Sequence, residues 1–224
     1  MPIFEILCLA NSRKHGGKCV AGLRTNGQGW IRPVKTDGPL LRRDCLLDNG
    51  SEVEVLDVAK IDLVGPQPEP HQPENWLIGG RRWKLVSRPA SPEQQEVMWS
   101  FLVSGPILLG NTADRAHVRS FEEKPPRESL TLVIPDKVEW TITENIFGNR
   151  QTRAVFKLKG TAYDLVVTDP SWENYLKDFP RGNYSSKSIG LKPKQKFLLT
   201  ISLGKPLHGY CYKLVASVIL PGDS

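Results

Sequence analysis

The stretch FEILCLANSRKHGGKCVAGLRTNGQGWIRPV, residues 4–34, consists of short apolar runs separated by polar segments that contain glycine. The run Phe4–Ala10 ends at the basic segment Ser12–Lys18, after which a second apolar run begins. Glycine and asparagine in Thr25–Gly29 tolerate positive φ and favour a turn before the third run, Trp30–Val34. The pattern predicts a meander of three β-strands whose first connection is a cationic loop.

The C-terminal half contains a longer series of runs in which apolar and polar residues partly alternate. We predict strands at Val138–Asn145, Gln151–Leu158, Tyr163–Thr168, Phe197–Leu203 and Cys211–Leu220. After the third run, Asp169 and Pro170 are typical of a helix start and predict a short helix at Trp172–Phe179. Three strands, a helix and two strands follow the order of a five-stranded OB barrel.

The N-terminal half is less regular but is also rich in predicted strands. Beyond the meander, we predict strands at Leu40–Leu47, Val53–Val64 and Arg81–Val86. Ser91, Pro92 and Gln94 form a capping pattern that predicts the start of a helix. The proline-dense segment after the second of these strands, which includes HQPENW (His71–Trp76), is predicted to be a loop.

The segment Arg119–Ser129 is charged, contains two prolines and has no periodicity, so we place the domain boundary there. The predicted organisation is an N-terminal OB-like barrel with a helix at its end (residues 1–118), a connector (119–129) and a C-terminal OB-like barrel (130–224). The fold class is thus mainly β, with two tandem five-stranded barrels of the OB type and short helices.

A short internal echo accompanies this division of the chain. Ser12, Lys14 and His15-Gly16 precede one apolar run, and Ser202, Lys205 and His208-Gly209 precede another. Short strand–loop–strand units arise easily by chance, whereas a real repeat indicates two related barrels. The sequence leaves both readings open.

The overall composition is that of a globular protein with a basic excess. The 224 residues are 39% apolar and 24% charged, and 30 Lys and Arg against 24 Asp and Glu give a net charge of +6. Such a charge favours polyanionic partners. The four cysteines lack metal-type or CxxC spacing, and no run has the length of a membrane span, so we expect a soluble, reduced, cytoplasmic protein.

Several segments together resemble the prokaryotic dual OB-containing domain family, and they extend over nearly the whole chain. They are LCLANSRKHGGKCVAG, GWIRPV, HQPENW, VVTDPSWE and ISLGKPLHGYCYKLVASVI. The resemblance implies two OB folds in one unit. It also implies a place among bacterial proteins linked by gene context to defence and to conflict with mobile elements, as an accessory subunit.

Catalytic and metal chemistry find little support in the sequence. A nucleophilic serine next to Lys14 requires a desolvated lysine, but the neighbouring residues are basic and polar. Cys19 lies in an apolar run, and the four histidines, His15, His71, His117 and His208, have no partner at metal-ligand spacing. We therefore expect a protein that is not an enzyme and that needs no metal or cofactor.

Binding of single-stranded or structured DNA or RNA is the function that these observations favour. In OB folds the nucleic acid crosses the second and third strands between two loops, where cations meet phosphates and aromatic rings stack on bases. The candidate nucleic-acid-binding residues are Ser12, Arg13, Lys14, Lys18, Trp30, Arg32, Lys187, Lys192, Lys194, Lys205, Tyr212 and Lys213. A solvated role for the cations and a core role for Trp30 remain the plain alternatives.

Two other classes of function stay open. A sensor of a small nucleotide is possible if HQPENW and the Ser12–Lys18 segment close over a deep pocket. An adaptor that binds proteins of a defence system is indicated if an exposed apolar patch accompanies the scattered cations. Neither reading involves a membrane.

Overall fold

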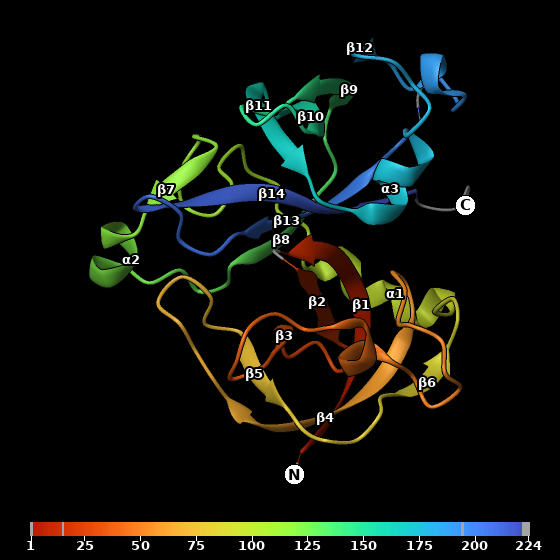
Figure 1. The fold of residues 1–224 in the computed structure, drawn as a ribbon, viewed down its shortest axis with the longest axis vertical. Coiled ribbons are helices and arrows are strands. Elements are labelled where there is room, and N and C mark those ends of the chain that lie inside the picture. Colours follow the sequence, from red (N-terminus) through yellow and green to blue (C-terminus); the bar gives the residue numbers. More distant parts are fainter. Residues whose placement is uncertain (1, 15, 194, 221–224) are drawn as a thin grey trace. The chain divides into compact units, whose positions relative to one another are not determined.

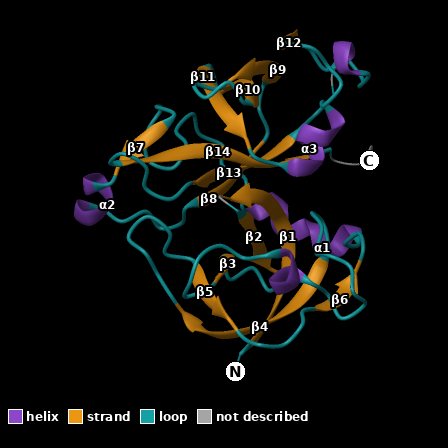
Figure 2. Cartoon of the chain, in the orientation of Figure 1, coloured by secondary structure: helices purple, strands orange, loops and turns teal. Residues whose placement is uncertain are grey.

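The computed structural model describes residues 2–14, 16–193 and 195–220, and Figures 1 and 2 show its strands and helices. Contacts divide the chain into two units. Unit 1 comprises residues 1–101 and 125–129, and unit 2 comprises residues 102–124 and 130–224. From the sequence we placed residues 102–118 in the first domain, whereas in the structure they belong to unit 2. For example, the Tyr163 hydroxyl donates to the carbonyl oxygen of Pro106 at 2.6 Å.

Five strands of unit 1 form a closed barrel. They are β1 (Ile3–Lys14), β2 (Gly17–Arg24), β3 (Trp30–Val34), β4 (Val58–Pro66) and β5 (Asn75–Ile78). Their order around the barrel is β1, β2, β3, β5, β4, and β4 pairs with β1 again. Strands β3 and β5 are parallel. This is the strand order of the OB fold.

Strand β1 closes the barrel because it pairs with two neighbours. Residues Ile3–Leu7 pair with β4, and the strand pairs with β2 from Ile6 onward. The register shifts between Cys8 and Ala10, which is a β-bulge. A bulge bends a strand and increases its twist, so one strand can serve both sides of the barrel.

Unit 2 repeats this arrangement with its first strand in two pieces. The strands are β8 (Leu130–Val133), β9 (Lys137–Glu144), β10 (Arg150–Leu158), β11 (Thr161–Val167), β13 (Leu198–Leu203) and β14 (Tyr210–Ile219). The order is β9, β10, β11, β14, β13, with β11 parallel to β14, and β13 then pairs with β8. Pro135 lies between β8 and β9 and has no N–H for a ladder, so the strand is interrupted there. Both predicted barrels are therefore confirmed.

The remaining elements lie between the barrel strands or at their edges. They are β6 (Lys84–Ser87), β7 (Arg115–His117), β12 (Gly182–Tyr184), α1 (Pro92–Ser100), α2 (Arg119–Glu123), α3 (Pro170–Tyr175) and the 3-10 helices η1 (Arg42–Cys45) and η2 (Lys187–Ile189). Ser91 and Asp169 cap α1 and α3, so both predicted helix starts are confirmed. Within the described ranges, no helix is both long and apolar enough to cross a bilayer.

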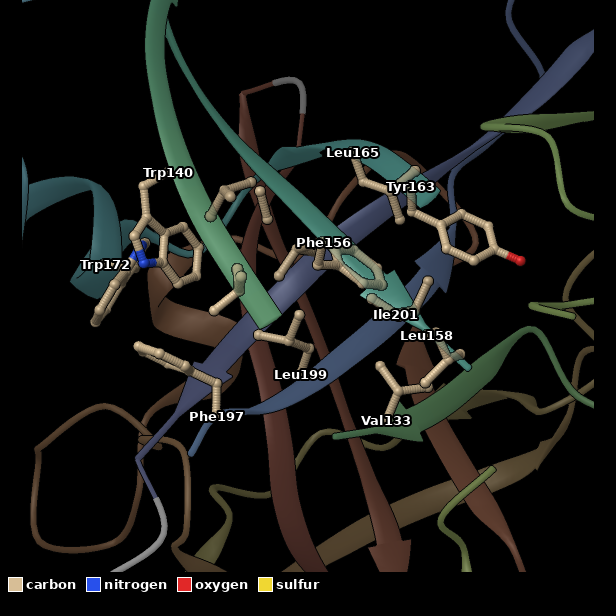
Figure 3. Close-up of a cluster of buried hydrophobic side chains, with 14 of the residues drawn as sticks. Val133, Trp140, Phe156, Leu158, Tyr163, Leu165, Trp172, Phe197, Leu199 and Ile201 are labelled. Carbon is tan, nitrogen blue, oxygen red and sulfur yellow. The ribbon is translucent and has the colours of Figure 1, made fainter. Parts of the chain in front are cut away.

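The core of unit 2 consists of aromatic and branched side chains from alternate strand positions (Figure 3). Trp140 lies against Trp172 with ring centroids 4.5 Å apart, and Phe156 stacks on Tyr163 at 5.4 Å. Because side chains alternate along a strand, the residues between these positions point outward. Any ligand of this barrel therefore meets those outward residues.

Three local expectations were wrong. The predicted strand Leu40–Leu47 contains η1, whose start is closed by the Asp44 carboxylate accepting from the backbone N–H of Leu41 at 2.7 Å. The predicted strand Val53–Val64 begins only at β4, because Leu56 turns the chain with φ of 71°. The predicted HQPENW loop contains the start of β5, which we did not predict because the segment before it is rich in proline.

The cationic loop predicted at Ser12–Lys18 is a tight hairpin instead. Ser12 pairs with Cys19 and Arg13 pairs with Lys18 within the β1–β2 ladder. The internal echo also has no structural counterpart, because its first copy joins the first and second strands of one barrel. Its second copy, at Ser202–Gly209, joins the fourth and fifth strands of the other. The two barrels share their strand order, and the echo does not mark equivalent positions.

Candidate functional site

The outer face of β2 and β3 in unit 1 is buried. Ala21 and Leu23 are fully buried on β2, and Trp30 and Arg32 on β3 are 4% and 1% exposed. These side chains alternate with the inward-pointing Val20 and Ile31 of the core. Trp30 and Arg32 are thus closed to a ligand in this structure, and the interface proposed below does not include them.

Arg32 is part of a buried polar network. Its Nε donates to the Glu74 carboxylate at 2.9 Å, its Nη2 donates to the Ser129 hydroxyl at 2.8 Å, and its Nη1 lies 3.0 Å from the Cys19 sulfur. Burial acts to raise the pKa of Glu74, but Arg32 and the hydrogen bonds from Ser129 lower this pKa below its ordinary value. The network links four segments of unit 1.

The other candidates of unit 1 surround the β1–β2 hairpin. The Ser12 hydroxyl is buried and donates to the carbonyl oxygen of Cys19 at 3.4 Å. Arg13 is exposed, and the backbone of Lys14 pairs with Gly17. Lys18 forms an ion pair with Glu52, which also accepts from Arg42. Arg13 is therefore the candidate here whose side chain is described and open to solvent.

The corresponding face of unit 2 is open. It consists of the outward residues of β10, β11 and β14, and it continues onto β7, which pairs with one end of β14 (Figure 1). The registers pair Arg153 with Val166, Val155 with Asp164 and Lys157 with Ala162 across β10 and β11, and Val166 with Leu214 across β11 and β14. At the start of β14, Tyr212 pairs with Arg115 and Tyr210 with His117 of β7. We call these eleven residues the outer face of unit 2.

An arginine and two tyrosines form the most distinctive part of this outer face. The guanidinium carbon of Arg115 lies 5.0 Å from the ring centroid of Tyr210 and 5.6 Å from that of Tyr212. The Arg115 side chain is 47% exposed. A guanidinium held over aromatic rings is positioned by cation–π attraction while its outer N–H groups stay available. Arg115 was not predicted, because its segment shows no periodicity.

The rest of the outer face has a more balanced charge. Arg153 forms an ion pair with Asp164 at 2.7 Å and also donates to Gln151 at 3.0 Å. Lys157 is exposed at the far end of β10. Arg153 is thereby fixed on the sheet. Arg115, whose Nε lies 4.0 Å from an Asp114 carboxylate oxygen, and Lys157 are more exposed and are the cations placed to meet an anion.

A shallow pocket lies on this outer face. Its volume is about 160 Å³, and its lining includes Asp114, Arg153, Val166, Tyr212 and Leu214. Pockets for drug-sized ligands measure about 300–1,000 Å³. The pocket thus has room for a part of a nucleotide, such as a base, and is too small to enclose a whole one.

Lys213 points to the other side of β14 and has a structural role. It is 1% exposed, and its Nζ donates at 2.7 Å to the carbonyl oxygens of Asn111 and Ala113 and to the Asn111 side chain. Desolvation lowers its pKa to about 8. The side chain holds the segment before β7 and does not reach the outer face.

The remaining predicted lysines lie in connections. Lys205 is exposed between β13 and β14, in a turn where Leu207 and Tyr210 exchange backbone hydrogen bonds. Lys187 lies in η2, and the exposed Lys192 follows it, both between β12 and β13. Lys194 lies outside the described residues. Tyr212 and Lys205 are therefore the predicted candidates that the structure places on or beside the outer face.

Metal-binding geometry is not found in the described part of the chain, where no three His, Cys, Asp or Glu side chains gather. Asp169 accepts from the backbone N–H groups of Ser171, Trp172 and Val218 and is 4% exposed. It is a structural carboxylate that caps α3 and joins it to β14.

The family model of the dual OB-containing domain matches residues 4–218. The chain belongs to this family, in agreement with the two barrels described above. Comparison with curated proteins and with solved structures returns no match.

Proposed function

We propose that this member of the dual OB-containing domain family binds single-stranded nucleic acid across the outer face of unit 2 and does not cleave it. OB folds commonly bind oligonucleotides on the face of the second and third strands, between two connecting loops. In unit 2 these strands are β10 and β11, and the loops are the β9–β10 and β13–β14 connections.

The contrast between the two barrels carries the proposal. Ala21, Leu23, Trp30 and Arg32 close the face of unit 1, whereas the matching face of unit 2 is open and holds the pair of tyrosines with Arg115. Tyrosine rings stack on bases of any sequence, and arginine and lysine neutralise phosphates. The net charge of +6 supports the same class of partner.

A sensor that encloses a small nucleotide receives less support. HQPENW does not border an open cavity, because Gln72 and Asn75 are 1% exposed and Glu74 bonds Arg32 and Ser129. The pocket on the outer face is also smaller than a nucleotide needs. Action within a prokaryotic defence or mobile-element complex stays a prediction from the family resemblance.

Fluorescence anisotropy with labelled 12-nucleotide DNA and RNA strands at low ionic strength tests the proposal. Tyr212→Ala is expected to weaken binding about tenfold, since one base stack contributes roughly 1–3 kcal/mol. Tyr212→Phe keeps the ring and is expected to bind within about twofold of the native protein.

Circular dichroism of each variant controls for folding. Absence of binding by the native protein contradicts the proposal, as does a Tyr212→Ala variant that is folded and binds with unchanged affinity.

A further inference from the structure

The β9–β10 connection carries two apolar side chains that are exposed to solvent. Ile146 is 93% exposed and Phe147 is 80% exposed, which are the highest values among the large apolar residues of the described ranges. Burying one such side chain is worth about 1.5–3 kcal/mol. An adjacent pair left open in this way indicates a contact that forms with a partner.

The turn that carries this pair is closed by several hydrogen bonds. The Asn145 side chain accepts from the backbone N–H groups of Phe147 and Asn149 at 2.9 and 3.0 Å. Asn145 also donates to the carbonyl oxygen of Asn149 at 2.8 Å, and Gly148 supplies a positive φ of 76°. These hydrogen bonds order the turn and hold the apolar pair at its tip.

Two arginine side chains lie at the base of this tip, one at the start of β10 and one just before β12. Arg150 begins β10 and donates to the carbonyl oxygens of Leu176 and Phe179 at 2.7 and 2.8 Å. Arg181 forms an ion pair with Glu144 at the end of β9. Both arginines are exposed. Arg181 is paired with an acid, whereas Arg150 bonds carbonyl oxygens, so the apolar tip with the Arg150 guanidinium at its base matches the end of a base-paired stack flanked by phosphates.

The tip is joined to the outer face of unit 2 through β10, which begins directly after it. Gln151 lies two residues before Arg153 on β10, so its side chain is on the same outer side, where it accepts from Arg153 at 3.0 Å. A nucleic-acid strand that lies on the outer face can thus continue past Gln151 to the tip.

We propose that Ile146 and Phe147 pack on the terminal base pair where a duplex meets a single strand, so that the preferred ligand is a junction of the two. This inference rests on the proposed function. One aromatic ring suffices to stack on one unpaired base, whereas the neighbouring side chains of Ile146 and Phe147 together offer a wider surface. The exposed end of a base pair, which consists of two bases, complements that surface.

The test compares four labelled probes by anisotropy: a 12-nucleotide single strand, a blunt 12-base-pair duplex, and this duplex with an eight-nucleotide tail at either the 3′ or the 5′ end. The native protein is expected to bind one tailed duplex about tenfold more tightly than the single strand, because one added stack is worth roughly 1–3 kcal/mol. The double variant Ile146→Ser/Phe147→Ser is expected to lose this ratio while it still binds the single strand.

A matched control is Val86→Ser, which changes an exposed apolar residue of β6 in unit 1 and is expected to leave every affinity unchanged. Phe147→Trp, which retains a flat ring, is expected to preserve the ratio. Single-strand binding without a preference for either tailed duplex overturns the junction proposal and leaves the proposed function intact. A double variant that keeps the preference also overturns it. Failure of the native protein to bind any probe overturns both proposals.

Discussion

Arg32 and Glu74 form an ion pair inside unit 1, with the arginine Nε 2.9 Å from the Glu74 carboxylate and side chains only 2% and 4% exposed. The two residues come from β3 and from the segment before β5, which run in parallel in the barrel. Ser129, far along the chain, bonds both of them. Residues that looked like parts of a binding surface in the sequence thus hold the barrel together.

The first prediction concerns this pair. Arg32→Met leaves the Glu74 carboxylate buried without its main partner and is expected to reduce the free energy of unfolding by about 3–5 kcal/mol. Urea unfolding followed by tryptophan fluorescence measures the change. The double variant Arg32→Met/Glu74→Met is expected to regain part of this loss, because it buries no unpaired charge. A single variant within about 0.5 kcal/mol of the native protein contradicts this account.

Acidification provides a second test of the same carboxylate. The pKa of Glu74 in the folded protein lies below its ordinary value of 4.5, so the unfolded chain binds more protons between these two values. The contribution of Glu74 to stability is then fully present above pH 4.5 and is lost as the pH falls through the lower pKa of the folded state. Urea unfolding from pH 3 to pH 7 gives the slope of the free energy of unfolding against pH, which is compared between the native protein and Glu74→Gln. Equal slopes below pH 4.5 are inconsistent with a lowered pKa.

Lys213 is expected to stabilise the segment before β7 and not to bind phosphate. Lys213→Met removes donors to Asn111 and Ala113, so hydrogen exchange of residues 111–115 is expected to accelerate. The salt dependence of nucleic-acid binding is expected to stay unchanged. If the variant reduces that salt dependence while exchange stays slow, Lys213 contacts the ligand after all.

The expectation that the protein is not an enzyme is tested with the ligands themselves. Labelled single strands incubated with the protein, with Mg²⁺ or with a chelator, are expected to remain intact on a denaturing gel. Chelation is also expected to leave the thermal unfolding temperature unchanged. Reproducible cleavage that disappears when an acidic residue is replaced shows instead that a catalytic site exists.

Local signals were sufficient to predict much of this fold. Ser91 and Asp169 identified helix starts, and the alternation in Val138–Leu158 identified the hairpin of β9 and β10. Trp30 and Arg32 could not be placed in the same way, because the burial of an outward-facing residue depends on segments distant in the sequence. Ser129, which bonds Arg32, lies 97 residues away.

The candidate site was predicted less well than the fold. Arg115 and Lys157 belong to the outer face through strand pairing, and pairing between β7 and β14 has no signature in the sequence. Phe147 offered one usable signal, since a large apolar residue in a turn breaks the rule that turns are polar. Tyr212 was found because it follows the predicted fourth-to-fifth strand loop of an OB barrel.

The salt dependence of binding tests the central claim, which is that the outer face of unit 2 binds single strands through Arg115 and Lys157. Each neutralised phosphate of a single strand contributes about 0.7 to the slope of log K against log salt concentration. The double variant Arg115→Ala/Lys157→Ala is therefore expected to reduce the slope by about 1.4, equally for all sequences. The matched control, Arg81→Ala/Arg82→Ala, removes two exposed arginines of unit 1 and is expected to keep the native slope. A slope that stays the same in the first variant, or falls equally in the control, contradicts the account.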